Sequence, residues 1–261
     1  MREVDEALAR AYAQRDQADP PQGVPPAPHW PALDRPTRAF KPAPVPPPGP
    51  RPLAELQWPA LVLTLEREWG ERFERMGQLL LGARQRQDLK VILFTSCHRA
   101  EGRTTLVLTL ARALSRQPLR TLVVDADLTG PMVARLLGLR PDVGLDDVVE
   151  HGQALADALI DAPDDHLGIL PMRSAVGRPR DFLASPAWTC TLARLRREYD
   201  LILVDGGPLF TGLSAAVLHR SVDAAVLVHH RDMTGERAVL RAREVLEAGG
   251  VPLLGLAETF V

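Results

Sequence analysis

The sequence is poor in cysteine, has no excess of basic charge and contains no long apolar run. Its 261 residues include only two cysteines, Cys97 and Cys190, too few for a disulfide framework. The net charge of −2 and the pI near 6.4 differ from the basic balance typical of nucleic-acid-binding domains. No apolar stretch approaches the roughly 20 residues that span a bilayer, and the acidic residues 1–6 are unlike the start of a signal peptide. We therefore expect a cytoplasmic protein that binds no nucleic acid, does not insert into a membrane and reaches one only through a partner.

Proline is concentrated at one end of the chain. Fifteen of the 24 prolines precede residue 60, with little apolar sequence between them. Such a segment buries too little surface to offset the entropy lost on ordering, so we predict a disordered arm over residues 1–56. The proline run at 42–48 favours polyproline II, which suits a semi-rigid spacer better than the alternative, a ligand for an SH3-like domain.

Residues 57–89 form a predicted helical lead-in. Their apolar residues recur at helical spacing: Leu61, Leu65, Trp69, Phe73, Met76 and Leu80. We interpret the charges from Glu66 to Arg75 as a solvated face with i,i+4 pairs, and an oligomer contact is the alternative.

Residues 90–261 alternate short apolar runs with longer amphipathic stretches. The predicted strands are 91–95, 121–125, 167–170, 201–205, 223–229 and 252–257. The predicted helices are 103–116, 131–138, 146–160, 188–198, 212–220 and 234–248. Strand followed by helix, repeated, indicates an α/β fold with a doubly wound, mainly parallel sheet in a three-layer α/β/α arrangement.

The segment 91–105 has the layout of a phosphate-binding P-loop: a buried strand, a tight loop and a helix start. The pattern G-x-x-x-x-G-K-[ST] uses glycines so that backbone N–H groups can surround phosphates, a lysine for the β/γ-phosphates and a hydroxyl for Mg²⁺. Gly102 and Thr104 fit this pattern. Arg103 replaces the lysine, and Cys97 stands at the first glycine. Cys97 is either an ordinary small loop residue, which we favour, or a redox-sensitive thiol near Arg99 and Arg103.

Carboxylates follow two further predicted strands. Asp125 and Asp127 end one strand, and Asp205 ends another. Ligands of open parallel sheets sit at the carboxyl ends of the strands, and Mg²⁺ prefers oxygen ligands. The sequence therefore predicts a magnesium nucleotide site there. The alternatives are helix capping by Asp125 and Asp127, and a turn at Asp205 with the two glycines that follow it.

With these motifs in order, residues 90 to about 257 resemble the bacterial tyrosine kinases, P-loop NTPases related to the ParA/MinD ATPases. The similar segments are T-S-C-H-R-A-E-G-R-T-T at 95–105, D-A-D-L-T-G-P at 125–131, G-L-D-D-V-V at 144–149, P-R-D-F-L-A-S at 179–185 and Y-D-L-I-L-V-D-G-G-P at 199–208.

The resemblance implies a site for ATP and Mg²⁺. The phosphates would lie against the loop residues Ala100, Glu101, Gly102, Arg103, Thr104 and Thr105. Mg²⁺ would be held by Thr104, Asp127 and Asp205. Asp125, as base for a tyrosine hydroxyl, and Arg103 would be the catalytic residues.

The chain departs from the family pattern at two loop positions. Arg103 is bulkier than lysine and forks toward two oxygens. Ala100 replaces a glycine, so a positive φ there would strain the loop. The sequence has only two tyrosines, Tyr12 and Tyr199, so we expect no tyrosine-rich tail of the kind these kinases phosphorylate.

The resemblance implies a protein that regulates exopolysaccharide or capsule synthesis and export, with weak tyrosine kinase or ATPase activity. Its expected partners are a membrane-bound polysaccharide chain-length regulator and further copies of itself. The first alternative is a non-catalytic regulator or scaffold with a degraded nucleotide site. The second is a positioning ATPase of the ParA/MinD type.

Overall fold

The computed structural model describes residues 56–162, 166–211 and 221–259. The predicted arm, apart from Leu56, and the predicted helix 212–220 lie outside these ranges. Within them, no helix combines the length and the apolar character needed to cross a membrane.

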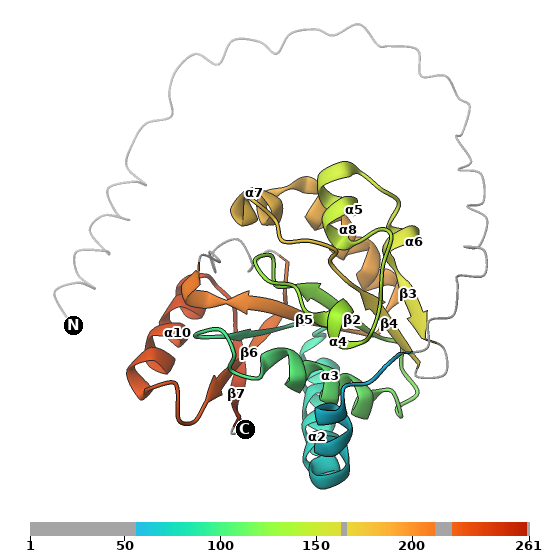
Figure 1. Cartoon of the computed structure of the whole chain (residues 1–261). Helices are drawn as coiled ribbons and strands as arrows, with labels where there is room; N and C mark the ends of the chain where they lie inside the picture. Colours follow the sequence, from blue (N-terminus) through green and yellow to red (C-terminus); the bar gives the residue numbers. More distant parts are fainter. Residues whose placement is uncertain (1–55, 163–165, 212–220, 260–261) are drawn as a thin grey trace, which may run out of the picture. The chain divides into compact units, whose positions relative to one another are not determined.

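The centre of the described chain is a seven-stranded sheet in the order β3-β4-β2-β5-β1-β6-β7 (Figure 1). Every neighbouring pair is parallel except β3 and β4. The strands are β1 Val91–Ser96, β2 Thr121–Ala126, β3 Ile160–Ala162, β4 Leu167–Leu170, β5 Leu201–Pro208, β6 Ala224–His230 and β7 Leu253–Thr259. The predicted α/β class with a mainly parallel sheet is confirmed.

Helices cover both faces of this sheet, which is why its central strands are apolar throughout. In β1, Val91 and Leu93 belong to one buried cluster, while Ile92 and Phe94 belong to the other. The first cluster is covered by α5 Leu145–His151, α6 Leu155–Ala158, α7 Pro179–Ala184, α8 Pro186–Glu198 and α10 Glu236–Ala248. The second is covered by α2 Ala60–Gln87, α3 Arg103–Leu114 and α4 Val133–Leu136.

Two predicted helices differ from the structure. The expected helix 146–160 is instead α5, α6 and the antiparallel strand β3, because Gly152 adopts a left-handed conformation at φ 68° and ends α5. The expected helix 131–138 is only the four residues of α4, and Gly138 at φ 67° follows it. The helix α7 was not predicted.

The predicted lead-in helix is α2, but its charges do not form the expected i,i+4 pairs. Glu66 accepts a hydrogen bond from Arg112 of α3 at 2.6 Å and pairs with Arg116, which also contacts Glu74 at 3.1 Å. The interpretation as a merely solvated face was therefore wrong for these charges, because they join α2 to α3. Trp69 marks a kink in α2, with φ −129°.

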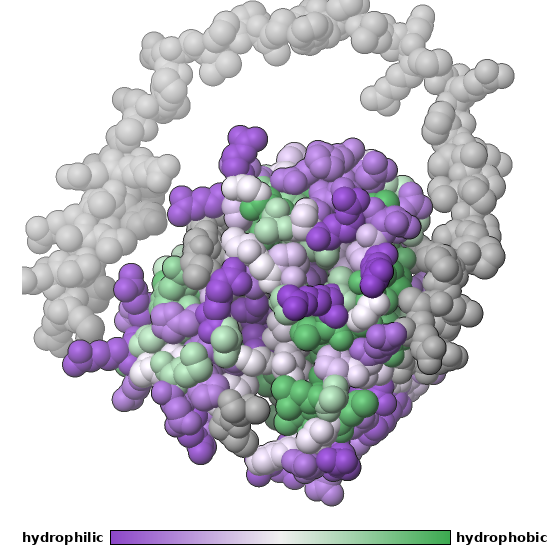
Figure 2. Space-filling model, in the orientation of Figure 1, coloured by the Kyte–Doolittle hydropathy of each residue, from purple (hydrophilic) through white to green (hydrophobic). Residues whose placement is uncertain are grey.

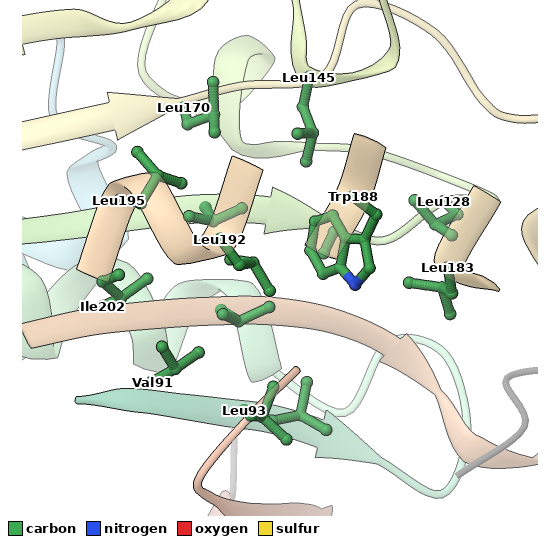
Figure 3. Packing of buried hydrophobic residues seen from close by; sticks show 14 of the residues in the cluster. Val91, Leu93, Leu128, Leu145, Leu170, Leu183, Trp188, Leu192, Leu195 and Ile202 are labelled. Carbon is green, nitrogen blue, oxygen red and sulfur yellow. The ribbon is translucent and has the colours of Figure 1, made fainter. Parts of the chain in front are cut away.

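Trp188 of α8 lies at the middle of the first buried cluster (Figure 3). Its side chain is fully buried, and its indole Nε1 donates to Ser221 Oγ at 3.0 Å. A buried indole N–H without an acceptor is costly. Ser221 supplies that acceptor and so fixes the orientation of the ring.

We expect Trp188→Ala to lower the free energy of unfolding by about 3–5 kcal/mol, since it leaves a cavity, and Ser221→Ala to lower it by about 1–3 kcal/mol. The measurement is urea denaturation followed by circular dichroism. Leu79→Ala, at a side chain that is 66% exposed, is the control and should change stability by less than about 0.5 kcal/mol. Equal losses in all three variants would contradict this account of the core.

Candidate functional site

Three adjacent strands place the predicted site residues together. In the sheet order β2-β5-β1, Asp125 of β2 is in register with Asp205 of β5, which is in register with Phe94 of β1. The loop that follows β1 therefore opens beside both carboxylates. The structure brings Asp127 to the same edge through its contact with the first residue of α3.

The loop between β1 and α3 has two residues in the left-handed region. Gly102 has φ 77°, where glycine carries no steric penalty. Ala100 has φ 63°, the strained conformation expected if this position of the loop requires a positive φ. Gly102 also faces Thr259 of β7 closely: a Cβ atom at Gly102 would lie 3.3 Å from Thr259 Cγ2.

The guanidinium of Arg103 is the centre of the site. It is buried at the first position of α3 and donates from each of its three nitrogens: Nε to Asp205 Oδ1 at 2.8 Å, one Nη to Asp127 Oδ2 at 2.8 Å and the other to Ser96 Oγ at 2.9 Å. Arg103 thus bridges the two carboxylates that were expected to hold Mg²⁺. A planar fork with several donors suits such bridging, which a lysine ammonium could not reproduce.

The remaining oxygens of these carboxylates are also engaged. Asp205 Oδ2 accepts from Thr104 Oγ1 at 2.7 Å. Asp127 Oδ1 accepts from the Thr129 hydroxyl at 3.0 Å and from the Gly130 amide at 3.1 Å, so this carboxylate also holds the turn that follows β2.

The site therefore has the residue types that bind Mg²⁺ but not the free oxygens. Thr104, Asp127 and Asp205 fit the ion by chemistry. In the arrangement observed, the guanidinium of Arg103 stands where both carboxylates converge, and a cation could use them only after Arg103 had moved. Within the described ranges, no group of three or more His, Cys, Asp or Glu side chains is arranged to hold a metal ion.

Burial and charge shift the pKa values of the ion cluster. Burial lowers the pKa of Arg103, but Asp205 and Asp127 outweigh it, so the net shift is upward. Burial raises the pKa of Asp205 by more than Arg103 and Thr104 lower it. The two upward shifts of the pKa therefore favour the charged form of Arg103 and disfavour that of Asp205. The site consequently keeps Arg103 charged.

Asp125 lies behind this cluster and caps the next helical segment. Its Oδ2 accepts from the amides of Met132 at 3.0 Å and Val133 at 2.9 Å, and its Oδ1 accepts from the Asp127 amide at 3.2 Å. The capping role weighed from sequence is thus present. Burial, followed by the charge of Asp205, raises its pKa to about 8. Its role as a catalytic base stays a prediction.

Glu101 holds the P-loop in a way that the sequence did not reveal. Its side chain is buried, accepts from the His98 amide at 2.7 Å and contacts the Thr234 hydroxyl. The Thr259 hydroxyl donates to the Glu101 carbonyl at 2.8 Å. The carboxylate of Glu101 therefore takes a backbone amide inside the loop, and its predicted contact with phosphate stays a prediction.

Two further residues of this region are Thr105 and Cys97. Thr105 lies in the first turn of α3, where its carbonyl accepts from Thr109 Oγ1 at 2.8 Å. Cys97 is buried, and burial together with Glu101 raises the pKa of its thiol to about 11. Since the thiolate is the reactive form, this environment favours the ordinary packed role of Cys97 over the redox-sensitive one.

Comparison with known proteins shows what this chain is similar to. No protein-family model matches the chain. The tyrosine-protein kinase CpsD of Streptococcus pneumoniae is 28% identical over 169 residues, which cover 64% of this chain and 74% of that protein. The tyrosine-protein kinase YwqD of Bacillus subtilis is 28% identical over 170 residues, which cover 65% of this chain and 71% of that protein. The chain is a relative of the bacterial tyrosine kinases.

Solved structures agree with this relationship. The VpsO kinase domain matches with a TM-score of 0.66 and 25% identity, over 76% of this chain and 98% of that one. The kinase domain of the Escherichia coli tyrosine kinase ETK shares the fold, with a TM-score of 0.72 and 20% identity over 82% of this chain and 85% of that one. MinD of Pyrococcus horikoshii, complexed with Mg-ADP, matches with a TM-score of 0.54 and 25% identity, over 64% of this chain and 68% of that one. The predicted kinship with P-loop NTPases is confirmed.

We expect Arg103→Ala to lower the free energy of unfolding by about 3–5 kcal/mol, because two buried carboxylates lose their cation. Millimolar Mg²⁺ should raise the melting temperature of this variant and leave that of the wild type unchanged. Differential scanning calorimetry with and without Mg²⁺ measures both effects. The matched control is Arg243→Ala on the exposed face of α10, which should be neutral. Equal stabilisation of all three proteins by Mg²⁺ would show that Arg103 does not stand in the place of the ion.

The pKa of Asp125 predicts how stability changes with pH. Because its pKa rises from 3.8 to about 8 on folding, the folded state binds the proton more tightly. The stabilisation is complete below pH 3.8 and is lost as the pH rises toward 8. We expect the free energy of unfolding to fall between pH 5 and 8, and Asp125→Asn to reduce that slope. Denaturation at several pH values measures it, and parallel slopes for the two proteins would contradict the shift.

Proposed function

We propose that this protein is a regulatory relative of the bacterial tyrosine kinases whose P-loop site does not support efficient phosphoryl transfer. The observation that carries the proposal is the bridge from Arg103 to Asp127 and Asp205. Phosphoryl transfer depends on positioning and on charge stabilisation around a magnesium nucleotide. A guanidinium that occupies the converging carboxylates competes with the metal for the same oxygens.

The relationship to these kinases indicates the process in which such a regulator would act. Its relatives carry the name tyrosine-protein kinase, and the resemblance places that family in exopolysaccharide or capsule synthesis and export. We propose that this protein works there, beside a membrane-bound chain-length regulator and with further copies of itself, as a cytoplasmic component. ATP is the ligand we propose for the loop, bound with little dependence on Mg²⁺.

The second candidate is an active tyrosine kinase or ATPase. One observation favours it: Thr104, Asp125, Asp127 and Asp205 all lie at one edge of the sheet, where a kinase of this ancestry would need them. In that case Arg103 would leave the carboxylates when nucleotide binds. The fold also supports the third candidate, a positioning ATPase. No separate feature of the site favours it.

The test compares the wild type with Arg103→Lys, which keeps the charge but removes the fork. We expect the wild type to hydrolyse ATP and to phosphorylate tyrosine roughly 100-fold more slowly than Arg103→Lys, which corresponds to about 2.7 kcal/mol of transition-state stabilisation. Calorimetry should show that Mg²⁺ strengthens ATP binding only in the variant.

Arg103→Lys combined with Asp127→Ala is the control, because it restores the lysine and removes a magnesium ligand. It should be as inactive as the wild type. A wild type that turns over ATP and loses that activity in Arg103→Lys would overturn the proposal, since Arg103 would then belong to a working loop. A lysine variant that gains nothing would also count against it.

A further inference from the structure

A cavity lies beside the candidate site but does not include it. Its volume is about 740 Å³, within the range of small-molecule sites. The lining comes from the segment that leads into α4, α4 itself, the loop that follows it, the start of the loop after β4 and the segment before α2: Gln57, Pro131, Ala134, Arg135, Gly138, Leu139, Arg140, Pro141, Met172 and Arg173. None of these residues belongs to the P-loop.

The charged residues of this lining are all arginines. Arg135, Arg140 and Arg173 contribute three positive charges, and no carboxylate lines the cavity with them. The protein as a whole carries a net charge of −2, so this concentration of positive charge is local. Strongly hydrophilic side chains stand beside hydrophobic ones on the face over α4 in Figure 2.

Two of the three guanidinium groups are available to a ligand. Arg173 is held in place, since it donates to the Asp142 carbonyl at 2.7 Å and lies 3.5 Å from Asp147. Both Arg135 and Arg140 are exposed at the rim of the cavity. Within the described ranges, neither side chain has a hydrogen-bonding or ion-pair partner. Guanidinium groups bind phosphoryl oxygens in a bidentate manner.

The cavity wall is fixed by a close backbone contact. Gly138 has φ 67°, and a Cβ atom there would lie 2.6 Å from Gln57 Oε1. The Gln57 amide also donates to the Leu137 carbonyl at 3.1 Å. The segment before α2 is therefore docked on the loop after α4, and the cavity exists before any ligand arrives. A preformed site loses less free energy to ordering when it binds.

We propose that this cavity binds a small molecule that carries a diphosphate group and an apolar body. Arg135 and Arg140 contact the phosphoryl oxygens, and Arg173 adds positive charge behind them. The apolar body lies against Ala134 and Leu139, which are half-buried and share the lining. This site is separate from the P-loop and does not depend on the function proposed for it.

The test titrates the full chain with inorganic pyrophosphate by isothermal calorimetry. We expect Mg²⁺-independent binding that weakens with salt, as charge-driven binding does. The double variant Arg135→Gln, Arg140→Gln should weaken it by at least about tenfold. The matched control is Arg237→Gln, Arg243→Gln on exposed positions of α10, which makes the same change in net charge and should bind as the wild type does.

A P-loop variant separates this site from the nucleotide site. Thr104→Ala should leave pyrophosphate binding unchanged, whatever it does to ATP. The proposal fails if pyrophosphate does not bind up to millimolar concentration, if the two double variants weaken binding equally, or if Thr104→Ala abolishes binding while the cavity variant retains it. Circular dichroism of each variant establishes that it is folded.

Discussion

The ion cluster around Arg103 is the interaction on which the site depends. Two strands, β2 and β5, end at one edge of the sheet and deliver Asp125, Asp127 and Asp205 to a small buried volume beside the loop after β1. Charged carboxylates in such a volume require a nearby cation, because each loses its hydration there. MinD of Pyrococcus horikoshii, which shares the fold, is complexed with Mg-ADP, whose metal ion is such a cation. Here the protein supplies it from its own loop, and the P-loop, the second strand and the fifth strand are joined through one guanidinium.

Arg103 differs from a lysine at this position of the loop in how many partners it can bind. A lysine in the loop would be a point charge directed at phosphates, whereas an arginine has donors on three nitrogens and can satisfy Asp127, Asp205 and Ser96 together. The gain is a closed, stable cluster. The loss is the free carboxylate oxygens that a metal requires. Glu101 acts in the same direction, since its buried carboxylate takes the amide of His98 inside the loop.

Asp125 combines a structural contact with a shifted pKa. Its carboxylate caps the segment that begins α4, and burial near Asp205 raises its pKa toward neutrality. The same segment leads into the wall of the arginine-lined cavity through Pro131 and Arg135. The candidate site and the cavity thus share one short stretch of chain, the segment that leads from Asp125 into α4.

The sequence by itself determined the sheet, six of its strands, and the edge at which the carboxylates meet, because apolar runs and strand-end aspartates are local patterns. It also indicated the strain at Ala100. It did not determine the short strand β3 or the break at Gly152, since a left-handed glycine inside an amphipathic stretch has no periodic signal. Only the tertiary structure decided that Arg103 bridges Asp127 and Asp205, and that Glu66 pairs with Arg112. These contacts join residues far apart in the chain, and their geometry follows from how the strands and helices pack rather than from any spacing in the sequence.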